Sequence, residues 1–298
     1  MSSYSKVVAV VGTNASGKSA LGIELAKRYN GEIISADSRQ VFRGLDLGSG
    51  KVTHEEMQGV PHHLIDVREV NEFFSMADFQ RMSYAAIEDI RARGRLPMIV
   101  GGTGLYVDAV LDGYLLSDKE PDLAYRAELE KMTTPQLYDM LMGLMPSVQV
   151  DANNRNRVMR MIERIHDGDD AMPAKQKRYE SLRLGVSWPR EVLAKRIDER
   201  LERRLAAGMI EEVQGLIDRG ATTEFLLGLG LEYRFITRYL MGEMSREDMV
   251  EKLAIAIKQF AKRQMTWFRR NPDIVWLDMA GDYMAQACEA TEAFLKAK

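Results

Sequence analysis

The strongest constraint on this chain is an apolar run that leads directly into a glycine-rich loop. Val7 to Val11 is continuously apolar, GTNASGKS follows at positions 12–19, and helical spacing runs from Lys18 to Tyr29. A strand before the pattern G-x-x-x-x-G-K-[ST] and a helix after it are the context of a phosphate-binding loop (P-loop), whose backbone N–H groups bind phosphate oxygens. Lys18 adds positive charge, and the Ser19 hydroxyl can ligate Mg²⁺. The predicted phosphate site consists of Gly12, Thr13, Asn14, Ala15, Ser16, Gly17, Lys18 and Ser19.

Short apolar runs alternate with helical segments in the first part of the chain. After the P-loop, strands are predicted at residues 32–35, 63–67 and 97–100, with a helix at 75–93. This alternation predicts an α/β fold, a doubly wound parallel sheet whose ligands bind beyond the carboxyl ends of the strands.

From about Gly113 the pattern changes to helices without strands. Helices are predicted at 123–132, 135–144 and 153–166, and the strand LRLGVSW then resumes the sheet. We therefore predict an all-helical insertion domain at 113–182. Residues 1–112 and 183–298 form the P-loop core domain, with C-terminal helices at 190–219 and 245–270, a last strand IVWLD and a terminal helix.

Composition excludes several classes of protein. The chain has 298 residues, of which 46% are hydrophobic and 29% charged, so a globular protein is expected. A run of about 18 apolar residues is absent, which argues against a membrane span. The single cysteine, Cys288, excludes an intramolecular disulfide and fits a cytoplasmic location. The net charge of −3 excludes a uniformly basic surface but leaves room for a basic cluster that binds nucleic acid.

Two polar clusters follow predicted strands. IISADSRQVF begins as a strand and breaks into Asp37, Ser38, Arg39 and Gln40, while PMIV ends in a glycine-rich turn with Thr103. Asp37 has two interpretations from sequence alone, a functional acid beside the P-loop or a helix cap. The turn at Thr103 is either a phosphate contact or a turn without a ligand. Asp66, in HLIDV, is a candidate for the acid of a nucleotide kinase.

Eight motifs in order carry a resemblance to one family. They are GTNASGKS, IISADSRQVFRGLDLGSGK, PHHLIDV, FSMADFQ, PMIVGGTGLYVDAVL, NRNRVMRMIE, RIDERLERRL with GMIEEV, and AKRQMTWFR. Together they span residues 7 to about 270, and the chain resembles the tRNA dimethylallyltransferases, also called tRNA isopentenyltransferases. The resemblance implies transfer of a dimethylallyl group from dimethylallyl diphosphate to the exocyclic amine of the adenosine 3′-adjacent to the anticodon, with release of diphosphate.

The resemblance also implies catalytic roles. Asp37 is expected to accept a proton from the weakly nucleophilic amine. Lys18, Thr103, Arg200 and Mg²⁺ bound to Ser19 are expected to stabilise the departing diphosphate. Helical spacing places Arg196, Arg200 and Arg204 on one face. Sequence alone favours a solvated stripe paired with Glu199 and Glu202, whereas the resemblance favours a catalytic or diphosphate role for Arg200.

The tRNA contacts implied by the resemblance fall on two segments and two further positions. The first segment follows the second predicted strand, the second lies on the helix predicted at 153–166, and the further positions are Thr103 and Arg126. The expected contacts are Asp37, Ser38, Arg39, Gln40, Thr103, Arg126, Asn156, Arg157, Val158, Met159 and Arg160. In the segment LGLEYR the chain departs from the usual family pattern, so no RNA contact is assigned between Leu229 and Arg234.

Lys258, Lys262 and Arg269 form a basic line on a later helix, either for RNA or for solubility. The expected partners are the anticodon stem-loop of tRNA and dimethylallyl diphosphate, bound by a monomer that does not associate with membranes. The lining of a prenyl pocket is not assigned. Three alternatives remain: transfer to free adenine nucleotides, a small-molecule P-loop kinase, and a non-enzymatic RNA-binding protein.

Overall fold

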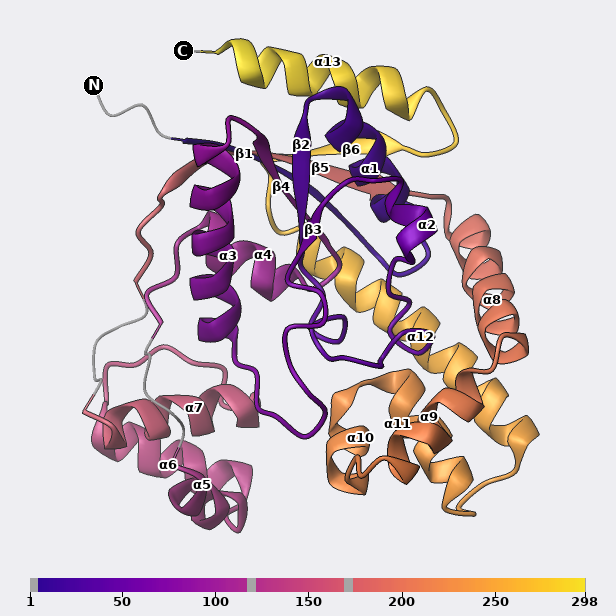
Figure 1. The fold of residues 1–298 in the computed structure, drawn as a ribbon. Coiled ribbons are helices and arrows are strands. Elements are labelled where there is room, and N and C mark those ends of the chain that lie inside the picture. The colour runs from indigo at the N-terminus through magenta and orange to yellow at the C-terminus, as the bar shows by residue number, and fades with distance from the viewer. Residues whose placement is uncertain (1–4, 117–121, 169–173, 298) are drawn as a thin grey trace. The chain divides into compact units, whose positions relative to one another are not determined.

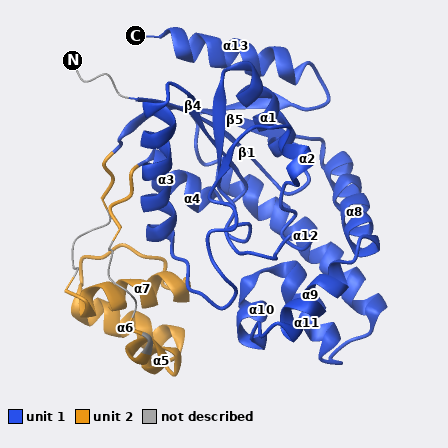
Figure 2. Cartoon of the chain, viewed as in Figure 1, with its two compact units in different colours: residues 1–112, 177–298 blue, residues 113–176 orange. Residues whose placement is uncertain are grey.

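The computed structural model describes residues 5–116, 122–168 and 174–297. The chain divides into two compact units, unit 1 with residues 1–112 and 177–298 and unit 2 with residues 113–176 (Figure 2). The predicted end of the insertion at residue 182 is therefore six residues too late. Strand β5 (Tyr179–Ser187) pairs with β1 (Ser5–Gly12) from its first residue, and this pairing places Tyr179 to Leu182 in the sheet of unit 1.

Unit 1 contains a six-stranded sheet in which every neighbouring pair of strands is parallel (Figure 1). The strand order is β3-β2-β4-β1-β5-β6. β1 lies near the middle, and helices cover both of its faces, which explains its continuous apolar run. The remaining strands are β2 (Gly31–Ser35), β3 (His62–His63), β4 (Leu96–Gly101) and β6 (Ile274–Asp278).

The sheet is doubly wound, as predicted. Alternate residues of β1 enter two different hydrophobic cores, because successive side chains of a strand point to opposite faces. Val8 and Val10 pack in a core with residues of α1 and α13. Val7 and Ala9 pack in a core with residues of α3, α4 and the end of α12. These helices are α1 (Lys18–Arg28), α3 (Met76–Ala92), α4 (Gly104–Leu111), α12 (Arg246–Phe268) and α13 (Tyr283–Lys296).

A group of C-terminal helices forms a third core in unit 1. Their apolar faces meet the loop after β2, where Val41 and Leu45 are fully buried. The single helix predicted at 190–219 is in fact two helices. Gly208, with a φ of 99°, separates them, because this left-handed conformation ends one helix and starts the next. The group consists of α8 (Arg190–Ala206), α9 (Met209–Asp218), α10 (Thr223–Leu229), α11 (Leu231–Leu240) and α12.

The third predicted strand, 63–67, is wrong in extent. β3 contains only His62 and His63, and the short helix α2 (His54–Met57) precedes it. Leu64 and Asp66 have φ values of 64° and 55°, which a strand cannot accommodate. The two histidines bond in different directions, His62 Nδ1 with the Val60 carbonyl and His63 Nε2 with Glu32. They therefore do not form a two-histidine metal site.

Unit 2 is helical, as predicted for the insertion. Its core contains residues of all three helices, among them Leu129, Leu137 and Ile162. The helices are α5 (Leu123–Glu130), α6 (Thr134–Leu144) and α7 (Arg155–His166). In the described part of both units, no helix has the length and apolar character needed to cross a bilayer.

Candidate active site

The P-loop connects β1 to α1 at the carboxyl end of the sheet. Gly17 caps α1 with a φ of 91°, a conformation that favours glycine. Gly12 is equally constrained, because a Cβ there would lie 2.4 Å from Val186 Cγ2 on β5. The predicted order of strand, loop and helix is confirmed, and the first N–H groups of α1 lie at the loop.

Side chains from distant segments hold the backbone of the P-loop. Arg196 Nε donates to the Ala15 carbonyl at 2.9 Å, and Trp188 Nε1 donates to the Ser16 carbonyl at 2.8 Å. Buried Gln264 of α12 accepts from Asn14 N–H at 3.0 Å and donates to the Gly102 carbonyl at 2.9 Å. Gln264 thus ties the P-loop to the turn after β4. Sequence reasoning missed this role, although Gln264 lies inside the motif AKRQMTWFR.

The turns after β2 and β4 are in direct contact. A Cβ on Gly101 would lie 2.1 Å from the Ala36 carbonyl oxygen, so only glycine permits this approach. Thr103 N–H donates to the same carbonyl at 3.1 Å, and Thr103 Oγ1 accepts from Ser38 N–H at 3.3 Å. The predicted neighbours Ser38 and Thr103 therefore lie together, and the Thr103 hydroxyl supports the turn that presents Asp37.

Asp37 does not cap a helix, because turns follow it and the next helix, α2, begins at His54. Its Oδ1 accepts from Arg39 N–H at 2.9 Å. Within the described residues, Oδ2 of Asp37 forms no hydrogen bond. One carboxylate oxygen is thus fixed by a local turn while the other is available to a ligand.

Gln40 differs from its neighbours in the predicted DSRQ segment. Gln40 is 8% exposed. Its Oε1 accepts from Ser35 Oγ at 2.9 Å, and its Nε2 donates to the Gly50 carbonyl at 3.3 Å. Its amide therefore supports the loop after β2, but Gln40 also lines the same cavity as Asp37, so the RNA contact expected for Gln40 stays a prediction. Arg39 instead lies over the Phe260 ring, with its guanidinium carbon 5.4 Å from the ring centroid.

The arginine face of α8 faces the protein and not solvent. Arg200 Nη2 donates to the Gly50 carbonyl at 3.4 Å, and Arg204 Nη1 lies 3.7 Å from Glu232 Oε1. Burial and the charge of Arg204 lower the pKa of Arg200 to about 10, so the guanidinium stays positive at neutral pH. Arg200 and Arg204 are therefore not part of a solvated stripe that pairs with Glu199 and Glu202.

A cavity of about 710 Å³ brings the predicted catalytic groups together. It is lined by P-loop residues 14–19, by Asp37 and by Arg200, whereas the predicted site residues Thr103 and Ser38 are not among its lining residues. Burial and the charge of Arg200 lower the pKa of Lys18 to about 8, and Asp37 partly opposes this effect. The cavity also has apolar lining from Ile23, Ile33, Val100, Ile197, Leu201 and Ile257.

Unit 2 presents only part of the predicted RNA segment. Asn156 and Arg157 are exposed, whereas Val158 and Met159 are buried in the core of the unit. The side chains of Val158 and Met159 therefore pack inward, and the RNA contact expected at these two positions stays a prediction.

Arg160 and Arg126 share one buried partner in unit 2. Each has a guanidinium nitrogen 3.2 Å from the Glu163 carboxylate, which is only 4% exposed. Glu163 offsets part of their charge and holds both guanidinium groups at the surface of unit 2. The side chains of the two arginines are about 40% exposed, so part of each remains accessible to solvent.

Comparison with known proteins gives one consistent result. A family model described as "IPP transferase" matches residues 40–271. This chain belongs to the IPP transferase family. Because the match begins at residue 40, the P-loop is an independent observation that agrees with it.

Close relatives match over nearly the whole length of the chain. The protein named tRNA dimethylallyltransferase 2 from Syntrophotalea carbinolica is 47% identical over 285 residues, which cover 93% of this chain and 95% of the relative. The tRNA dimethylallyltransferase from Streptococcus sanguinis is 40% identical over 294 residues, which cover 97% and 98%.

Solved structures agree in fold. The full-length tRNA isopentenylpyrophosphate transferase from Bacillus halodurans has a TM-score of 0.75 and 38% identity, with 98% of each chain covered. A eukaryotic dimethylallyltransferase that acts on tRNA has a TM-score of 0.79 and 27% identity, with 97% of this chain and 77% of that chain covered.

The position of Asp66 in this IPP transferase family member does not match that of a kinase acid. Its Oδ1 lies 2.5 Å from Lys51 Nζ, which also contacts Asp46 and the Phe42 carbonyl. Asp66 therefore neutralises Lys51 beside the loop after β2. In the described residues, no group of three or more His, Cys, Asp or Glu side chains forms a metal site.

Proposed function

We propose that this chain transfers a dimethylallyl group from dimethylallyl diphosphate to the exocyclic amine of the adenosine 3′-adjacent to the anticodon of tRNA, and releases diphosphate. One observation carries this proposal: a phosphate-binding loop, a carboxylate and a partly buried arginine line the same cavity. The names of relatives that act on tRNA support it.

The site provides a proton acceptor for the amine and positive groups for the departing diphosphate. The amine nitrogen forms a bond to the allylic carbon while the carbon–oxygen bond to diphosphate breaks. Oδ2 of Asp37 takes the proton that the amine loses, because Oδ1 is held by Arg39 N–H. Negative charge grows on the departing diphosphate, where Lys18, Arg200 and the N–H groups of the P-loop stabilise it.

Ser19 fits the role of a magnesium ligand. Ser19 lies in the first turn of α1 and is one of the residues that line the cavity. Mg²⁺ is commonly held by one or two protein oxygens together with phosphate oxygens and water, so a dedicated carboxylate cluster is not required. When bound, the ion would neutralise charge on the leaving group.

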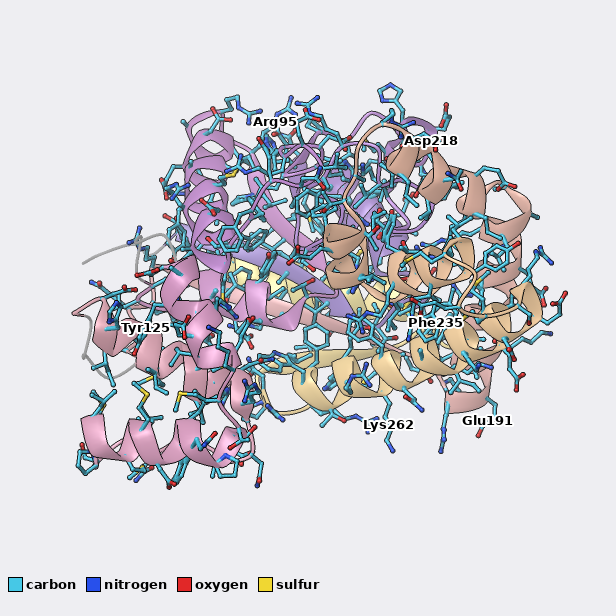
Figure 3. The ribbon with its side chains drawn as sticks, turned by 90° about the horizontal axis from the view of Figure 1, so that it is seen from below. Arg95, Tyr125, Glu191, Asp218, Phe235 and Lys262 are labelled. Atoms are coloured by element: carbon cyan, nitrogen blue, oxygen red, sulfur yellow. The ribbon has the colours of Figure 1, made fainter. Side chains whose placement is uncertain are left out.

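Two exposed basic surfaces are suited to the RNA backbone. In unit 2, Arg157 is exposed beside Asn156. In unit 1, Lys262 and Arg263 of α12 are exposed, as is Arg269 directly after the helix, and the Lys262 side chain extends from the outer side of α12 (Figure 3). Lysine and arginine side chains bind phosphates without regard to sequence.

The direct test uses labelled dimethylallyl diphosphate, Mg²⁺ and an anticodon stem-loop with the target adenosine, with AMP as competing acceptor. Label is expected on the stem-loop, and a stem-loop with guanosine at that position serves as control. Label on AMP alone would assign the chain to free nucleotides. No label on either acceptor would contradict prenyl transfer.

The role of Asp37 has its own test. Asp37→Ala is expected to lower kcat at least about 10²-fold while the Kd for the stem-loop changes less than about threefold, because the carboxylate accepts a proton in the transition state. Single-turnover rates and filter binding measure the two quantities. An equal loss in both would make Asp37 an adenine-binding residue and not the base.

A further inference from the structure

The loop after β2 points three consecutive backbone N–H groups at one carboxylate. Glu212 Oε2 accepts from Asp46 N–H at 3.1 Å and from Leu47 N–H at 2.6 Å. Glu212 Oε1 accepts from Gly48 N–H at 3.0 Å. Hydrogen bonds to a charged acceptor are stronger than those between neutral groups, so Glu212 of α9 holds this loop firmly.

Tyr233 of α11 completes the arrangement. Its hydroxyl donates to Glu212 Oε1 at 3.0 Å, and the residue is 0% exposed. Its ring packs against the loop backbone, because a Cβ on Gly48 would lie 2.6 Å from the ring carbon Cζ. Burial and the neighbouring Glu212 charge raise the pKa of Tyr233 well above its usual value, so the phenol remains a donor.

Two residues after Gly48, at Gly50, the same loop contacts an arginine of α8. The Gly50 carbonyl accepts from Arg200 Nη2 at 3.4 Å and from Gln40 Nε2 at 3.3 Å. The packing is close, since a Cβ on Gly50 would lie 2.2 Å from Arg200 Nη2. Displacement of the loop would therefore displace the acceptor that orients Arg200.

We propose that Glu212 and Tyr233 are positioning residues for the diphosphate site, and that they act through the Gly50 carbonyl on Arg200. The identity of the anion as the diphosphate of the prenyl donor rests on the proposed function. Neither side chain lines the cavity, so their effect on the anion is indirect. Tyr233 also gives a role to part of the segment that departs from the family pattern.

The central variant is Glu212→Gln. Its amide keeps the size of the side chain, but one accepting oxygen becomes an NH₂ group that faces a backbone N–H, so part of the loop loses its acceptor. The matched control is Glu211→Gln, which removes the same charge from an exposed neighbour on α9. Calorimetric titration with inorganic diphosphate in Mg²⁺ buffer reports binding without prenyl transfer.

Glu212→Gln is expected to weaken diphosphate binding about tenfold, while Glu211→Gln leaves the Kd within about twofold. In an Arg200→Ala background the Glu212→Gln effect should shrink to less than about twofold, because the guanidinium through which Glu212 acts on the diphosphate is already absent. An unchanged Kd in the first variant, or the same fold-change in both backgrounds, would overturn the proposal.

A milder variant covers the case in which Glu212→Gln does not fold. Tyr233→Phe removes one of four hydrogen bonds to Glu212 and keeps the buried ring. A shift of about threefold in the diphosphate Kd is expected, again lost in the Arg200→Ala background. Thermal melts confirm that each variant is folded at the titration temperature. A Tyr233→Phe protein that melts earlier but binds diphosphate normally would show a structural role only.

Failure of the proposed function is distinguishable from failure of this inference. If the wild-type chain binds diphosphate but modifies no acceptor, the function is wrong while the titrations still test Glu212 and Tyr233. If the chain modifies the stem-loop and Glu212→Gln binds diphosphate normally, only this inference fails.

Discussion

Helices α8 and α7 both place arginines at helical spacing opposite apolar residues. On α8, Arg200 and Arg204 face the cavity and contact the Gly50 carbonyl and Glu232. On α7, Arg157 is exposed, and Arg160 is 42% exposed beside buried Glu163. The same sequence pattern thus produces a buried cationic site in unit 1 and an open basic surface in unit 2.

The difference comes from what each helix packs against. A glycine in the loop after β2 leaves room for two guanidinium groups of α8 against its backbone, whereas Arg157 and Arg160 of α7 lie at the surface of unit 2. A buried cation in such a site has lost its water and gains strongly from an anionic ligand, whereas an exposed one gains little. We therefore expect α8 variants to affect the diphosphate, and α7 variants to affect RNA binding and its salt dependence.

Arg200→Ala provides the strongest test of this comparison. It should lower kcat/KM for the prenyl donor by about 10²- to 10³-fold, because a buried guanidinium that faces the leaving group is lost. Arg190→Ala, at an exposed position of the same helix that does not line the cavity, is the control and should change kcat/KM less than about twofold. A loss of only a few-fold for Arg200→Ala would mean that the burial of this arginine has no catalytic purpose.

Gly50→Ala tests whether the loop glycine makes the cationic site possible. A Cβ there would lie 1.4 Å from Arg204 Nη2, so the two arginines must move, and donor affinity should fall about tenfold. Gly59→Ala is the matched control. Gly59 has a similar positive φ of 78°, but no atom lies within 4 Å of an added Cβ. Gly59→Ala therefore introduces backbone strain without a steric clash. Equal effects in both variants would assign the loss to strain.

The pH dependence should differ between the two ligands. The pKa of Lys18 is lowered to about 8, so the ammonium is charged below pH 8 and is lost as pH rises through that value. Donor binding should therefore be about three- to tenfold weaker at pH 9 than at pH 7. Stem-loop binding through the exposed arginine side chains of unit 2 should not follow this profile. A flat donor profile would contradict a contact between Lys18 and diphosphate.

The smallest effect is expected in unit 2. Arg157→Ala should weaken stem-loop binding about threefold and reduce the salt slope by about one, as for one lost phosphate contact. Lys131→Ala removes an exposed charge elsewhere in unit 2 and is the control. Filter binding at several salt concentrations measures both. The same slope for Arg157→Ala and wild type would remove this arginine from the RNA surface.

Short-range signals predicted much of the fold. Continuous apolar runs identified the central strands, since a parallel strand covered on both faces needs apolar residues throughout. The errors occurred where one residue changes the backbone direction. Gly208 divides a pattern that is otherwise helical, and the positive φ of Leu64 ends a strand despite its apolar side chain.

The candidate site was predictable only where a local sequence motif indicates a chemical role. The P-loop and Asp37 were identified in this way, and the cavity brings them together with Arg200. Gln264 and Glu212 were missed, because each acts through hydrogen bonds to backbone groups far away in the sequence. Gln264 bonds Asn14 across 250 positions, and no local pattern in the chain marks such a partner.

This distance also has a consequence for protein synthesis. The ribosome releases the amino-terminal end first, so GTNASGKS leaves the exit tunnel long before Gln264 is added. A chain that stops short of residue 264 has a complete phosphate motif but lacks the amide that joins Asn14 to Gly102. The nascent chain therefore cannot assemble its full anion site until Gln264 has left the ribosome.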